Sequence, residues 1–206
     1  MRTKIDIENW IRKDHFRLFT RFEEPFFGVT VNIDCTGGYK NAKEQGVSFF
    51  LYYLYRALKA ANSIENFRYR IFEDEVFLYD KTHASPTINR PDGSFGFGYM
   101  DYEEDEKLFI DKAMVEKERV SASTGLVPSV SGQNVIHISA LPWLNFTSIS
   151  HARAFSFPDS CPKISFGKMN EVDGKLWMPV SIHVHHGLMD GFHVAQFVER
   201  FEAEMK

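Results

Sequence analysis

Residues 182–191, which read IHVHHGLMDG, are the stretch that decides the fold and chemistry of this chain. The apolar–polar alternation up to His186 is typical of a strand, and Asp190 and Gly191 open an amphipathic segment typical of a helix. Histidine moves protons readily near neutral pH because its ordinary pKa lies there. A carboxylate is favoured at the start of a helix by the helix dipole. The pattern HHxxxDG therefore predicts a proton-transfer site where a strand gives way to a helix.

Side chains alternate between the two faces of the strand predicted to end at His186. His183 and His185 share one face, and His186 falls on the other. A metal site built from His183, His185, His193 and Asp190 is disfavoured, because its ligands would come from opposite faces. A lone histidine here would be interpreted as a hydrogen-bonded core residue, but the aspartate and glycine that follow favour a functional role.

The rest of the chain reads as strands mixed with a few helices, which predicts an α+β fold with a sheet covered by helices on one face. A strong hairpin signal lies at Asp173 and Gly174, and residues 90–93 have the composition of a turn. Helices are predicted from a cap at Asp6 to Phe19, at 47–62, 105–120 and 194–201. Strands are predicted at 29–34, 69–72, 76–79, 134–141, 163–169 and 176–184.

Length and composition indicate one globular domain over residues 1–206, with 44% hydrophobic and 25% charged residues. The net charge of −4 argues against nucleic acid as a partner, and no apolar run is long enough for a membrane span. The N-terminus lacks the apolar core of a signal peptide, and two cysteines form neither a disulfide framework nor a metal-type spacing. We therefore expect a cytoplasmic protein. Its 20 phenylalanines fit a Phe-rich core, an apolar pocket or a subunit interface.

Three segments together resemble the trimeric type of chloramphenicol acetyltransferase. They are residues 10–16 (WIRKDHF), 138–146 (ISALPWLNF) and 185–195 (HHGLMDGFHVA). The resemblance implies the CoA-dependent acyltransferase fold, an α+β two-layer sandwich whose mixed sheet carries helices on one face. It also implies a homotrimer with active sites at the subunit interfaces. The implied activity is acetyl transfer from acetyl-CoA, a co-substrate, to a hydroxyl of chloramphenicol, which inactivates the antibiotic without a metal.

The resemblance also assigns roles to residues of the reaction centre. His186 would be the general base, which takes the proton of the acceptor hydroxyl and returns one to the CoA thiolate. Asp190 would pair with Arg12 and hold the loop that carries the histidine. Ser139 would donate a hydrogen bond to the tetrahedral oxyanion, and Ser165 would order a water beside it.

Binding residues are implied less uniformly. Lys168 would lie near the phosphates of CoA. Phe27, Thr87, Phe95 and Phe157 match or approximate positions of the acceptor pocket.

Two pocket positions depart from the family pattern. Phe19 replaces a tyrosine, and Lys163 replaces an aliphatic residue. By strand parity Lys163 shares the face of Ser165, so this ammonium is a candidate for the acceptor pocket.

Three alternatives remain. The acceptor could be a different hydroxylated small molecule, an interpretation that Phe19 and Lys163 favour. A lipoamide-linked acyltransferase shares HHxxxDG, but no lipoyl or linker segment precedes the domain. A ligand-binding trimer without catalysis would need none of the proton chemistry that His186, Asp190, Arg12 and Ser139 supply.

Overall fold

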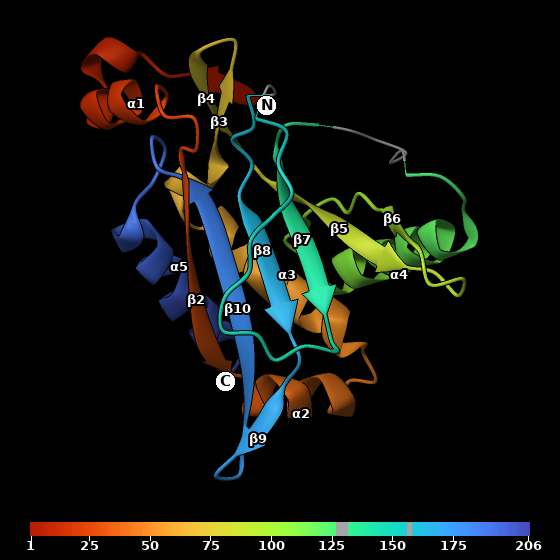
Figure 1. Cartoon of the computed structure of the whole chain (residues 1–206). Helices are drawn as coiled ribbons and strands as arrows, with labels where there is room; N and C mark the ends of the chain where they lie inside the picture. The colour runs from red at the N-terminus through yellow and green to blue at the C-terminus, as the bar shows by residue number, and fades with distance from the viewer. Residues whose placement is uncertain (127–131, 156–157) are drawn as a thin grey trace.

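The computed structural model describes residues 1–126, 132–155 and 158–206. A large mixed sheet has the strand order β2-β10-β8-β7-β5-β6, and a small sheet has the order β1-β4-β3 (Figure 1). The strands are β1 (Arg2–Lys4), β2 (Phe26–Asp34), β3 (Tyr69–Phe72), β4 (Glu75–Tyr79), β5 (His83–Asn89), β6 (Phe95–Phe97), β7 (Val135–Leu141), β8 (Lys163–Gly167), β9 (Asn170–Val172) and β10 (Lys175–His185). The α-helices are α1 (Lys13–Phe19), α2 (Thr36–Glu44), α3 (Phe49–Asn62), α4 (Glu106–Ala122) and α5 (Gly191–Glu204).

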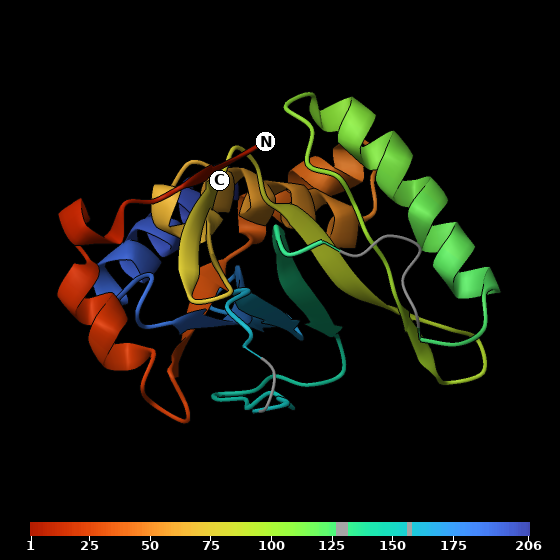
Figure 2. The same cartoon turned by 90° about the horizontal axis from the view of Figure 1, so that it is seen from above.

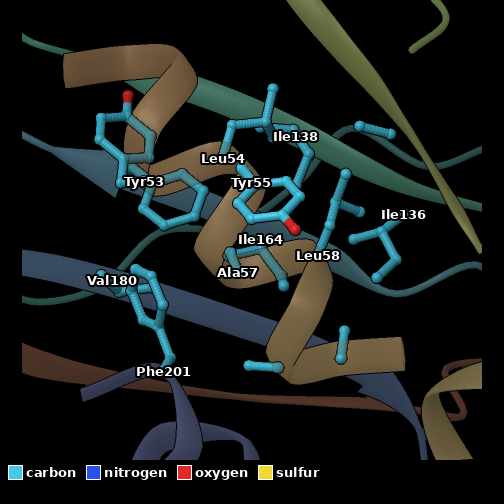
Figure 3. Close-up of a cluster of buried hydrophobic side chains, with 14 of the residues drawn as sticks. Tyr53, Leu54, Tyr55, Ala57, Leu58, Ile136, Ile138, Ile164, Val180 and Phe201 are labelled. Atoms are coloured by element: carbon cyan, nitrogen blue, oxygen red, sulfur yellow. The ribbon is translucent and has the colours of Figure 1, made fainter. Parts of the chain in front are cut away.

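Helices α2, α3, α4 and α5 lie on one face of the large sheet, α1 lies beyond the end of β2, and the segment after β7 crosses the opposite face (Figures 1 and 2). Alternate residues of the central strands point toward the helices, where Ile138, Ile164 and Val180 belong to the same buried cluster as Leu58 and Phe201 (Figure 3). Burial of these apolar side chains, at ~25 cal/mol per Å², is the main force that fixes the helix layer on the sheet. The α+β fold with helices on one face is therefore confirmed.

The opposite face of the central strands is polar. Ser139 on β7 lies opposite Ser165 on β8, which in turn lies opposite Ser181 on β10. Ser165 and Ser181 are fully buried. The period of two that puts isoleucine and valine into the core therefore also lines up this row of hydroxyls on the other face.

Several boundaries differ from the sequence predictions. Asp6 caps a short 3-10 helix, Ile7–Asn9, and α1 starts later, at Lys13. The predicted strand 163–169 ends at Gly167, and the hairpin at Asp173 and Gly174 joins β9 to β10. These two turn residues have φ angles of 52° and 75°, as a tight hairpin turn requires.

The sequence reading also missed β1, β5, β6 and α2. No helix in the described ranges is long and apolar enough to cross a membrane.

Candidate active site

His186 lies in the turn directly after β10, one residue beyond the strand, and not within it as predicted. Its backbone N–H donates to the carbonyl of Pro25 at 2.8 Å. The imidazole stacks on Phe19, with ring centroids 4.0 Å apart, and contacts Phe27 at 4.6 Å. Phe27 lies opposite Val184 in the sheet register and packs on the core, so His186 is held on the helix side of the sheet edge. Its Nδ1 is buried with no hydrogen-bond partner among the described residues.

Arg12 joins the N-terminal segment to the loop that carries His186. Its Nη1 donates to Asp190 Oδ2 at 2.8 Å, and its Nη2 donates to the carbonyl of His186 at 3.0 Å. Arg12 is only 6% exposed, so these two partners replace the water that burial removes from its guanidinium. One guanidinium therefore ties the N-terminal segment to the backbone of His186 and to the start of α5, which lies 178 positions further along the chain.

Asp190 has a second structural task as the N-cap of α5, where it accepts from the N–H of Phe192 at 3.0 Å. Partial burial works to raise the pKa of this carboxyl, but the hydrogen bond from Arg12 and the nearby His193 outweigh burial and hold the pKa below its ordinary 3.8. His193 completes a capping box, because its Nδ1 accepts from the N–H of Asp190 at 3.2 Å. Nδ1 of His193 also lies 2.9 Å from Oδ1 of Asp190, a contact that would be an ion pair only if Nδ1 carried a proton. Burial lowers the pKa of His193, so the imidazole is neutral and Nδ1 acts as the acceptor.

His185, which the sequence analysis considered only as a disfavoured metal ligand, shapes the same turn. Its Nδ1 accepts from the N–H of Gly187 at 3.1 Å, across His186. Burial lowers the pKa of His185 to about 4, so the ring is neutral and Nδ1 is free to accept at pH 7. The pair of adjacent histidines was the sequence signal that could have identified this residue. Two neighbouring residues at a strand end point to opposite faces, so the second histidine of the pair cannot share the role of the first.

Ser139, Thr87, Phe95 and Lys163 line one cavity of about 740 Å³ on the polar face of the sheet. Ser165 is the β8 neighbour of Ser139, and its Oγ is buried with no partner in the part of the chain that the structure describes. Four predicted site residues are thus brought together around a space large enough for a small molecule.

Lys163 is buried at 7% exposure and its ammonium contacts the carboxylate of Asp159. The ammonium also donates to the carbonyl of Cys161 at 3.2 Å and lies 4.7 Å from the ring centroid of Phe26. Sequence reasoning missed Asp159, because it lies in the segment that crosses the sheet, where no periodicity predicts a contact.

Two groups of predicted residues lie far apart within one chain. Ser139 shares a row with Ser181, two strands away, and His186 lies five residues beyond Ser181. Strand spacing and rise place the Cα atoms of Ser139 and His186 ~19 Å apart. Phe19 and Phe27 accompany His186, whereas Thr87, Phe95 and Lys163 accompany Ser139.

The remaining predicted positions are less informative. Lys168 is exposed just after β8, with its backbone N–H bonded to the carbonyl of Leu144 at 2.7 Å, so its ammonium is available to an anion. Phe157 lies outside the described residues. A separate hollow of about 560 Å³ between α3 and α4 contains none of the predicted site residues.

One group of potential metal ligands is found in the described residues. The donor atoms of His137, Asp159 and Cys161 lie within 4.8 Å of one another. The ammonium of Lys163 already contacts Asp159, which disfavours a dication at this place. The group thus fits an ion-paired cavity wall better than a metal centre.

Comparison with known proteins gives consistent matches along the chain. The model of the chloramphenicol acetyltransferase family matches residues 1–202. Chloramphenicol acetyltransferase 3 of Escherichia coli is 31% identical over 203 residues, which cover 97% of this chain and 95% of that protein. The enzyme of Bacillus pumilus is 29% identical, covering 93% and 88%.

Solved structures agree. A chloramphenicol acetyltransferase superposes with a TM-score of 0.88 at 34% identity, covering all of both chains. A probable dihydrolipoamide acetyltransferase from Listeria monocytogenes shares the fold, with a TM-score of 0.63 at 13% identity over 93% of this chain and 88% of that one. The resemblance stated from the three sequence segments is confirmed, and the chain belongs to the chloramphenicol acetyltransferase family.

Proposed function

We propose that this chain transfers the acetyl group of acetyl-CoA to a hydroxyl of an acceptor, with chloramphenicol as the acceptor that its relatives' names indicate. The observation that carries the proposal is the Arg12 bridge, which holds both Asp190 and the backbone of His186. A bidentate guanidinium restrains position well, and a general base works only when its nitrogen is held within hydrogen-bond reach of the proton.

In the proposed reaction, the unprotonated imidazole of His186 takes the proton of the acceptor hydroxyl as its oxygen attacks the thioester carbonyl. The oxygen of the tetrahedral intermediate becomes anionic and accepts a hydrogen bond from the hydroxyl of Ser139. Ser165, whose Oγ is buried without a partner among the described residues, would hold a water beside this anion. When the intermediate collapses, the C–S bond breaks and the imidazolium returns its proton to the thiolate of CoA.

We also propose that the working site is shared between copies of the chain in a homotrimer. A separation of ~19 Å between Ser139 and His186 is too long for both to touch one reacting carbonyl, since strand geometry leaves neither Cα within side-chain reach of the other. A neighbouring copy that presents its His186 to the cavity of Ser139 would complete the site. Light scattering at micromolar concentration should give the mass of three chains, and a monomer that still acetylates would contradict the shared site.

The binding assignments belong to the same proposal. The exposed ammonium of Lys168 is suited to the phosphates of CoA, Phe19 and Phe27 to one side of the acceptor, and Thr87 and Phe95 to the other. We propose a cytoplasmic, single-domain enzyme that needs neither a metal nor nucleic acid.

The test is release of thiol from acetyl-CoA with and without chloramphenicol, with mass spectrometry of the product. His186→Ala is the matched variant, and loss of a general base should lower the rate by ~10²–10⁴. Circular dichroism would show that the variant is folded. A folded His186→Ala protein that releases thiol at the unsubstituted rate would remove the histidine from the mechanism.

A further inference from the structure

The cavity that contains Ser139 has a wall of charged and hydrogen-bonding groups. Lys163, Arg153 and Asp159 all line it, and the side chains of Lys163 and Arg153 are at most 10% exposed. Residues 127–131 and 156–157 contain no ionisable acid or base, so they add no charge to this wall.

The two cations are held side by side by Phe26. The guanidinium of Arg153 lies 3.9 Å from the centroid of this ring, and the ammonium of Lys163 lies 4.7 Å from it. Such contacts stabilise cations without using their N–H donors.

Both cations keep spare donors. Lys163 donates to Asp159 and to the carbonyl of Cys161, which leaves one of its three N–H groups. Arg153 pairs with Glu24, which is half exposed to solvent, while its Nε is buried with no partner in the described ranges.

A further polar residue belongs to the same wall. His151 lines the cavity, and its Nε2 is buried without a partner among the residues that are described. Burial, with His183 nearby, lowers the pKa of His151 to about 4, so the ring is neutral and adds no charge. Buried polar atoms that lack partners are uncommon in folded proteins, so the presence of Arg153 Nε and His151 Nε2 in one cavity wall favours a polar ligand.

A cationic ligand is disfavoured, because it would meet Lys163 and Arg153 in the wall, while their carboxylate partners Asp159 and Glu24 are already engaged. A wholly apolar ligand is disfavoured as well, because it would leave these donors unpaired and dry. A carboxylate satisfies both conditions, since its negative charge is attracted by the two cations and its oxygens accept the hydrogen bonds of their spare donors.

We propose that this cavity selects acceptors that carry a carboxylate in addition to the hydroxyl that is acetylated. The inference rests on the proposed acetyl transfer, because it concerns the acceptor of that reaction. Lys163 on β8 lies opposite His137 on β7, and Ser139 lies two residues further along β7. Strand geometry therefore places the Cα atoms of Lys163 and Ser139 ~8 Å apart. The carboxylate and the reacting hydroxyl should therefore lie at opposite ends of a small rigid molecule.

The probes are 4-(hydroxymethyl)benzoate and 4-(hydroxymethyl)benzamide, which share size, ring and primary hydroxyl and differ in charge. Dissociation constants from ligand-observed NMR titrations decide the inference, and thiol release from acetyl-CoA is measured separately to test acetyl transfer. The wild-type protein should bind the benzoate about tenfold more tightly than the benzamide, as a charge-assisted hydrogen bond provides. A benzoate preference without thiol release would contradict the transfer reaction and leave the anion site supported.

Variants should change the preference in opposite directions. Arg153→Gln should reduce the benzoate preference toward one, and Asp159→Asn should increase it. Lys163→Met leaves the partly buried carboxylate of Asp159 without its cation, so the double variant Lys163→Met/Asp159→Asn keeps the test valid if the single variant does not fold.

The control is the exposed pair on α4, altered as Lys107→Met/Asp111→Asn, which should leave the preference unchanged. An equal or weaker affinity of the wild-type protein for the benzoate would overturn the proposal. So would a preference that survives both Arg153→Gln and the Lys163/Asp159 double variant.

Discussion

Two inactive variants of this chain should restore activity when they assemble together. His186→Ala removes the proposed base, and Ser139→Ala removes the proposed oxyanion donor. Ser139 lies in a row across the middle of the large sheet, whereas His186 lies beyond the end of β10 on the other face, ~19 Å away by strand geometry. If a site combines His186 of one copy with Ser139 of the next, a mixed trimer contains some sites with both residues intact.

The expected size follows from random assembly. A site is intact when the copy that supplies the histidine carries only Ser139→Ala and the copy that supplies the serine carries only His186→Ala. At equal amounts of the two variants, about a quarter of all sites meet this condition. Selection for mixed cyclic trimers raises the share to about one third, because each mixed trimer has one intact site among its three. Each parent alone should retain ~1% of the unsubstituted rate or less, from the usual effects of losing a base or an oxyanion donor.

The assay is thiol release from acetyl-CoA after co-expression of the two variants with different affinity tags and purification through both. The control mixes His186→Ala with the double variant His186→Ala/Ser139→Ala, which cannot form an intact site. A doubly tagged mixture no more active than the mean of its parents would show that both residues act within one chain. The shared-site proposal would then be wrong, whatever the mass of the assembly.

Other predictions concern the support of His186. Asp190→Asn should lower the free energy of unfolding by ~2 kcal/mol. This is less than the ~3–5 kcal/mol lost when a fully buried pair is broken, because the Asp190 side chain is one third exposed and asparagine still caps the helix. A double-mutant cycle with Arg12→Met at fixed protein concentration should give a coupling above ~1 kcal/mol, and simple additivity would show that the pair contributes nothing. The pKa of His185 is lowered on folding from 6.5 to about 4, so the unfolded chain binds the extra proton between these values. Stability should be complete above pH 6.5 and fall as the pH drops toward 4, and His185→Asn should flatten this slope by up to ~1.4 kcal/mol per pH unit in urea titrations.

The elements found from the sequence are those with strong local signals. Helix α4 starts where Asp105 caps it, with the carboxylate accepting from the N–H of Leu108 at 2.8 Å. The β9–β10 hairpin turns at Asp173 and Gly174 because these residues tolerate positive φ. Such signals act over a few residues, so tertiary contacts do not override them.

The missed elements have weak or contrary signals. Helix α2 contains Gly37 and Gly38, which lower helix propensity, and packing against the C-terminus compensates, since Gly38 N–H donates to the carbonyl of Met205 at 2.6 Å. Strand β5 contains Pro86, which cannot donate to a ladder, yet it pairs in parallel with β7. These two elements are stabilised by partners that are distant in sequence, and no local pattern reports them.

The residues of the candidate site also divide into those that the sequence predicted and those that it did not. The roles of His186, Arg12 and Asp190 came from the resemblance, and the structure places these residues in direct contact. The partner of Lys163 could not be predicted, because Asp159 lies in an irregular segment. The sequence analysis identified Lys163 as a candidate for the acceptor pocket. Its ion pair with Asp159 shows how the ammonium can stay charged in a buried wall.

The polar row on the sheet supports the proposal that one chain does not complete the chemistry alone. Ser139 and Ser165 face away from the helices because their neighbours Ile138 and Ile164 fill the core, and a one-residue slip would exchange the two sets. His186 follows β10 and is fixed on the helix side by Phe19, Phe27 and the backbone contact of Arg12. The packing that stabilises each half thus holds the base and the oxyanion donor apart. Only a second copy can bring another His186 to the row without unfolding either half, so the trimer would be a requirement of the reaction and not an added source of stability.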